Sequence, residues 1–132
     1  MFMLPVAFHY VDWSLFLLRL MVALVFGASG FGHLKAPRER AKDIGMSVGF
    51  TVFLGAAELA GALGLVFGVL TQWAAIGLIL LMLGAIYKKI VVWETGFWGE
   101  KSMGWHYDLM LVVMNLVILC TGGGRIALMP PM

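Results

Sequence analysis

The chain has 132 residues, of which 62% are hydrophobic and 12% are charged, and its mean hydropathy is +0.98. Soluble globular domains carry about 25% charged residues, so this composition excludes a soluble protein and predicts a single domain embedded in a lipid bilayer. The formal net charge of +2 is too small to indicate nucleic-acid binding, and the single cysteine, Cys120, excludes a disulfide within one copy.

Four apolar runs follow one another along the chain. A helix rises ~1.5 Å per residue, so about 20 residues cross the ~30 Å hydrocarbon core. Residues 1–13 are apolar and aromatic, lack the basic region of a signal peptide, and are expected at the membrane interface. The spans are expected at residues 14–32, 49–70, 73–92 and 105–121. The sequence therefore predicts an all-α fold, an antiparallel four-helix bundle in the membrane.

Polar connections at 33–47 and 93–104 separate these spans, and Pro37 is expected to end any helix in the first of them. Seven Lys and Arg residues lie in or beside the two connections, whereas Arg125 alone lies on the opposite side. By the positive-inside rule the connections are cytoplasmic and both termini are outside, in a plasma membrane of the bacterial type.

Glu58 lies near the middle of the second span. An ionised side chain at that depth costs at least ~2.5 kcal/mol unless it is paired or faces a polar cavity. From helical rise, Asn115 lies at about the same depth, and Arg19 lies about 8–10 Å away in depth, a gap that its long side chain can largely cover. We therefore predict a mid-membrane cluster of Arg19, Glu58 and Asn115, with Arg19 paired to Glu58.

A second polar group, formed by His33, His106, Tyr107 and Asp108, is expected nearer the cytoplasmic edge. Two imidazoles without a cysteine or carboxylate at ligand spacing make an incomplete metal site, so no metal is predicted. Ionisable groups within a membrane are candidates for ligand binding or proton relay. The Arg19–Glu58 pair serves equally well as a structural clamp that fixes helix register, and the sequence leaves this choice open.

Small residues in two spans predict close helix packing. Gly55 and Gly61 lie beside Glu58 and permit a neighbouring helix to approach closely. Gly77 and Gly84, seven residues apart on the third span, are expected to form a packing seam.

Three segments of the chain resemble the DoxX-like family of small four-span membrane proteins: LLRLMVALVFGASGFGHLKAP, FLGAAELAGALGLVFGVLTQWAA and YDLMLVVMNLVILCTGGGRIAL. Two positions depart from the family pattern, with Ala62 in place of a second glycine and Gln72 in place of a basic residue. The matching features are Arg19, Gly32 with Lys35, Glu58 followed by Gly61, the Gly-x-Leu-Thr turn from Gly68 to Thr71, and Gly124 with Arg125.

The resemblance implies an association with membrane oxidoreductase complexes, because the namesake group includes the small subunit of a thiosulfate:quinone oxidoreductase. Shared fold does not fix chemistry, so whether the chain is an enzyme stays open. In the redox interpretation no cofactor is bound covalently, Arg19 donates to a carbonyl of a lipid quinone, Glu58 passes protons, and electrons come from a partner redox protein. The alternatives are a non-catalytic accessory subunit of a larger membrane complex and a small-solute carrier, which would require a homo-oligomer.

Overall fold

The computed structural model describes residues 4–99 and 104–130, so residues 1–3 of the expected interfacial segment and 100–103 of the second polar connection lie outside the described residues. Helices make up most of the described chain, and no strand occurs in it. The all-α fold expected from the sequence is confirmed. In chain order the helices are the 3-10 helix η1 (Pro5–Tyr10), α1 (Val11–Lys35), α2 (Pro37–Ile44), α3 (Val48–Phe67), α4 (Thr71–Tyr87), the π-helix η2 (Lys88–Val92) and α5 (Trp105–Thr121).

Three helical segments of the described chain are long and apolar enough to cross a membrane: Pro5–Lys35, Val48–Phe67 and Thr71–Val92. The fourth, α5, is apolar but has 17 residues, which extend over about 25 Å. Large apolar side chains are exposed on the outer faces of these helices, among them Leu24 and Phe53. Helices that are apolar on all sides are typical of membrane spans. The protein is therefore a membrane helical bundle.

The first polar connection contains a short helix that the sequence analysis did not predict. α1 ends just before Pro37, as expected, and Pro37 also begins α2, because proline is well suited to the first helical position, where no N–H is needed. The preceding Ala36 is extended, with φ −133°, as the residue before a proline prefers. α1 therefore ends at Lys35, and α2 turns away from it at the surface of the bundle.

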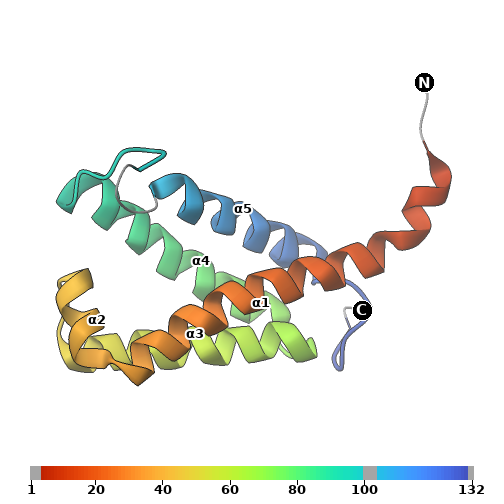
Figure 1. The fold of residues 1–132 in the computed structure, drawn as a ribbon. Helices are drawn as coiled ribbons and strands as arrows, with labels where there is room; N and C mark the ends of the chain where they lie inside the picture. Colours follow the sequence, from red (N-terminus) through yellow and green to blue (C-terminus); the bar gives the residue numbers. More distant parts are fainter. Residues whose placement is uncertain (1–3, 100–103, 131–132) are drawn as a thin grey trace.

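The long helices form two pairs, α1 with α3 and α4 with α5, which meet at one end of the molecule and diverge toward the other (Figure 1). We call the end where the pairs meet the tail end, because it holds the α3–α4 turn and residues 122–130. The opposite end, which holds α2 and the connection from η2 to α5, is the loop end. The largest apolar side chains of the core are Phe26, Leu65, Leu78 and Ile118.

Hydrogen bonds from the tail close one end of the bundle. α3 ends at Gly68, whose φ of +70° reverses the chain into α4. The backbone N–H of Leu128 donates to the carbonyl of Phe67 at 2.9 Å, and the hydroxyl of Thr71 donates to the carbonyl of Gly122 at 2.7 Å. Carbonyls that a helix end leaves free thus find donors inside the protein, as they must in lipid.

Glycines allow α1 and α3 to pack closely along their length. A Cβ added at Gly30 would lie 2.7 Å from the carbonyl oxygen of Gly55, and one added at Gly55 would lie 2.8 Å from the Cβ of His33. Real side chains do not tolerate such distances, so both positions require glycine for this packing. The close approach is of the kind that small residues permit between membrane helices.

The seam expected at Gly77 and Gly84 is not formed. A Cβ added at either residue would meet no atom within 4 Å in the described part of the chain, and both residues are exposed. Their regular spacing places them on one face of α4, but that face packs against no other described helix at these positions. The prediction was wrong because spacing alone does not distinguish a packing face from an open one.

Replacing Gly30 by alanine is expected to destabilise the protein by about 1–3 kcal/mol, the usual cost of overpacking a tight site. The new methyl group would push against the Gly55 carbonyl and force α1 and α3 apart. Thermal unfolding of the detergent-solubilised protein measures the effect. Gly77→Ala is the matched control, since it adds the same methyl group in open space. Equal unfolding temperatures for the two variants would contradict the close packing of α1 and α3.

Candidate functional site: a cavity at the loop end

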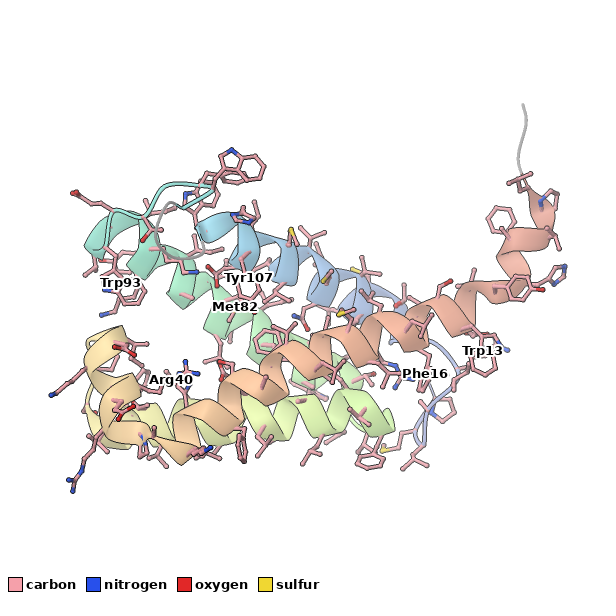
Figure 2. All side chains as sticks on the ribbon, in the orientation of Figure 1. Trp13, Phe16, Arg40, Met82, Trp93 and Tyr107 are labelled. Atoms are coloured by element: carbon pink, nitrogen blue, oxygen red, sulfur yellow. The ribbon has the colours of Figure 1, made fainter. Side chains whose placement is uncertain are left out.

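A cavity of about 530 Å³ lies between the two helix pairs at the loop end. Its walls come from α1, α3, α4, η2 and α5, and from the segment that joins α2 to α3. Met82 and Tyr107 project into the space between the pairs, and Trp93 lies at its rim (Figure 2). Most of the lining is apolar. The polar exceptions are Ser29, His33, Glu58, Tyr87, Lys88, Lys89, Tyr107 and Asp108.

Glu58 is a buried acidic residue of the cavity lining. It belongs to the buried face of α3, and 6% of its surface is exposed. The close approach at Gly30 holds the backbone of α1 against its Cβ, since a methyl group at Gly30 would lie 3.2 Å from that atom. Its Oε2 atom has no hydrogen-bond partner among the described residues. A buried polar atom without a partner is costly, so a hydrogen-bond donor placed beside this oxygen would relieve that cost.

Asp108 and Lys89 form an ion pair on the wall provided by α5 and η2. The Lys89 Nζ atom lies 2.8 Å from Asp108 Oδ2, and the side chains are 16% and 4% exposed, respectively. The same ammonium lies 5.6 Å from the centre of the Tyr107 ring, within the range of a cation–π contact. Each of these three residues lines the cavity. Lys89 therefore presents a fixed positive charge to it.

The π-helical turn η2 determines where Lys89 lies. The N–H of Trp93 donates to the carbonyl of Lys88 at 2.8 Å, five residues back, which widens the last turn after α4. Lys89 was not among the site residues predicted from the sequence. One signal pointed to it: Asp108 lies about one turn inside the membrane edge and needs a counter-charge, and the preceding span ends in Lys88 and Lys89 at that same edge.

The two histidines predicted to share a polar group lie in different surroundings. His33 lines the cavity, and its Nδ1 is 2.9 Å from the carbonyl oxygen of Ser29. His106 does not line it. Its Nδ1 is 2.7 Å from the carbonyl oxygen of Phe97, and its ring packs against Phe97 and Trp98. The cavity thus unites His33 with Asp108 and Glu58, and leaves out His106.

Arg19 does not pair with Glu58, which corrects the interpretation of the sequence. It is fully buried toward the tail end, where its guanidinium donates to the carbonyl of Leu65 at 3.1 Å and to the carbonyl of Ile126. Leu65 is two turns beyond Glu58 on α3, about 10 Å along the helix. The Arg19 guanidinium donates to backbone carbonyls near the end of α3 and in the tail. It therefore does not extend toward the Glu58 carboxylate.

Asn115 also lies outside the cavity, so the predicted cluster of three residues is not assembled. It is fully buried, and its Nδ2 donates to the carbonyl of Leu111 one turn earlier at 2.8 Å. Its Oδ1 atom has no partner among the described residues. The depth estimate for Asn115 did not identify its partner, because an asparagine in a helix can bond to its own backbone.

The fold and the site together define a membrane helical bundle with a partly open, mainly apolar cavity between two helix pairs. The profile of the DoxX-like family matches residues 17–122, which include all the long helices except the start of α1, and the chain belongs to this family. Searches of curated proteins and of solved structures found no match.

Proposed function

We propose that the cavity at the loop end binds the headgroup of a lipid quinone, and that the protein is the membrane subunit of an oxidoreductase or redox-linked complex. The observation that carries this proposal is the Oε2 atom of Glu58, a buried polar atom without a partner among the described residues, in a residue that lines a mainly apolar cavity.

The cavity suits such a ligand in size and in character. Sites for small organic ligands usually measure about 300–1,000 Å³, with apolar walls and a few converging polar groups. A volume of about 530 Å³ falls in this range. The partial opening between the divergent helix pairs leaves a way out for a long apolar tail, which would lie among the lipid chains.

The residues of this chain have distinct roles in the proposal. A bound quinone supplies two-electron, two-proton redox chemistry. Glu58 holds or passes a proton inside the cavity, and His33 offers a second titratable group on the opposing helix α1. Lys89 provides a donor for a ligand oxygen. Arg19 has no part in this binding, because its guanidinium bonds to carbonyls toward the tail end. Electrons come from a partner redox protein.

The proposal also includes an orientation. The basic residues gathered at the loop end assign that end to the cytoplasm and both termini to the outer side of a bacterial-type plasma membrane. The ligand cavity would then open near the cytoplasmic face, where a peripheral redox partner can approach.

Filling the cavity tests the proposal without touching its polar groups. Gly84 lines the cavity, and a Cβ added there meets no described atom within 4 Å. Gly84→Leu is therefore expected to weaken binding of 2-decyl-1,4-benzoquinone at least ~10-fold, a loss of about 1.4 kcal/mol. Titration calorimetry of the protein in lipid nanodiscs measures the affinity.

Gly77→Leu is the matched control for that experiment. It makes the same change on the same face of α4, in equally open space, but outside the cavity lining. Its affinity is expected to match that of the unaltered protein. Absence of quinone binding by the unaltered protein, together with stable association with a larger membrane complex, would instead favour the non-catalytic accessory subunit.

A further inference from the structure

We propose that the cavity is selective for a neutral, hydroxyl-bearing amphiphile and so prefers the hydroquinone form of a lipid quinone over the quinone form. Glu58 accepts the hydroxyl hydrogen of this ligand, and Lys89 donates to its other oxygen. This inference rests on the proposed function and goes beyond it, because the two groups select one redox form of the ligand.

The acceptor end of the site is Glu58. An ionised carboxylate only accepts hydrogen bonds, and the Oε2 atom has no donor among the described residues. The carbonyl oxygens of a quinone are also acceptors only, so they leave this atom unpaired. A hydroquinone hydroxyl donates, and a hydrogen bond to a charged group is among the stronger kinds. Glu58 therefore discriminates between the two forms when it is ionised, whereas a protonated Glu58 could also donate to a quinone carbonyl.

The donor end is Lys89. Its ammonium has three N–H donors and forms an ion pair with Asp108, with Nζ 2.8 Å from Oδ2. Asp108 and the ring of Tyr107 hold the ammonium in place from the same wall of the cavity. Another N–H is thus available to a ligand oxygen. Both quinone and hydroquinone oxygens can accept it, so Lys89 contributes affinity for either form and Glu58 contributes the selectivity.

The charge balance of the lining argues for a neutral ligand. The lining contains two basic residues, Lys88 and Lys89, and two acidic residues, Glu58 and Asp108. A carboxylate or phosphate headgroup would therefore find no excess positive charge, and it would lie close to the unpaired oxygen of Glu58. A fatty acid, which would suit the apolar walls, is disfavoured for this reason.

Three probes of similar size test the selectivity directly in the unaltered protein. They are 2-decyl-hydroquinone kept reduced under anaerobic conditions, 2-decyl-1,4-benzoquinone, and the dimethyl ether of the hydroquinone, which lacks the hydroxyl hydrogens. In nanodiscs the hydroquinone is expected to bind on the order of 10-fold more tightly than either of the others, the effect of one hydrogen bond to a charged group.

Variants then assign the preference to Glu58. Glu58→Gln is expected to reduce the hydroquinone-to-benzoquinone ratio to within about threefold, since its amide can donate to a carbonyl as well as accept. Glu39→Gln is the matched control, because Glu39 is an exposed carboxylate on α2 outside the cavity lining, and it should leave the ratio unchanged. The unfolding temperature of each variant establishes that it is folded.

The possible outcomes separate this inference from the proposed function. Equal binding of the three probes to the unaltered protein would overturn the selectivity but leave quinone binding intact. Binding of none of them would overturn both. Tighter binding of decanoate than of the hydroquinone would overturn the inference and point to an anionic ligand. Because these comparisons need no substitution, they decide the matter even if Glu58→Gln does not fold.

Discussion

Arg19→Met is expected to destabilise the protein by about 3–5 kcal/mol, the cost typical of breaking a buried network that involves a charge. The guanidinium joins α1 to the carbonyls of Leu65 and Ile126. Without it these two carbonyls lose the side-chain donor that α1 provides. Thermal unfolding of the detergent-solubilised protein should move to a lower temperature by about 10 °C or more. Arg19→Lys should recover part of the loss, because lysine keeps the charge but lacks the planar fork.

Arg125→Met is the control for this prediction. It removes the same charge at the same end of the molecule, but the Arg125 side chain is exposed, and only its backbone N–H bonds to Asp12, at 3.0 Å. The expected change is within about 0.5 kcal/mol. Folded Arg19→Met should bind 2-decyl-1,4-benzoquinone normally. If Arg19→Met instead left the stability unchanged and abolished quinone binding, Arg19 would belong to the ligand site, as the sequence suggested.

Sequence patterns predicted the long helices of this protein well, because helix formation in lipid depends mainly on the residues of each segment itself. Long apolar runs must form helices in lipid, where each backbone group needs a partner within its own segment. Helix α5 begins and ends at residues 105 and 121, the bounds expected for the fourth span, after Gly104 and before a run of three glycines. α2 was missed because Pro37 was interpreted as a stop signal, although proline is equally suited to the first turn of a new helix.

The candidate site could be predicted only in part, because partners depend on tertiary structure. The sequence indicated correctly that Glu58 is buried, since its surroundings are small and apolar. It did not reveal that Arg19 bonds to main-chain carbonyls, because such acceptors are present at every residue and leave no pattern in the sequence. The position of Lys89 depends on a π-helical turn, which single-sequence patterns do not reveal.

Replacing both residues of the ion pair at the cavity wall is expected to destabilise the protein less than replacing Asp108 alone. Asp108→Leu should destabilise the protein by about 2–4 kcal/mol, because it leaves the largely buried Lys89 without its counter-charge. Lys89→Met should have an effect of the same sign, since Asp108 would then remain as an unpaired, nearly buried carboxylate beside the cavity. The double variant should be more stable than Asp108→Leu alone, because neither charge is then left unpaired.

A double-mutant cycle from unfolding measurements gives the coupling between the two residues, expected at about 1–3 kcal/mol. Lys88→Met is the control for Lys89→Met, because the neighbouring lysine also lines the cavity but lies outside the ion pair. Combined with Asp108→Leu, it should give effects that add. Additive effects for Lys89 and Asp108 would instead mean that the contact contributes nothing to stability. The lysine would then be free to move in the cavity, and an induced fit around the ligand would replace the fixed donor proposed above.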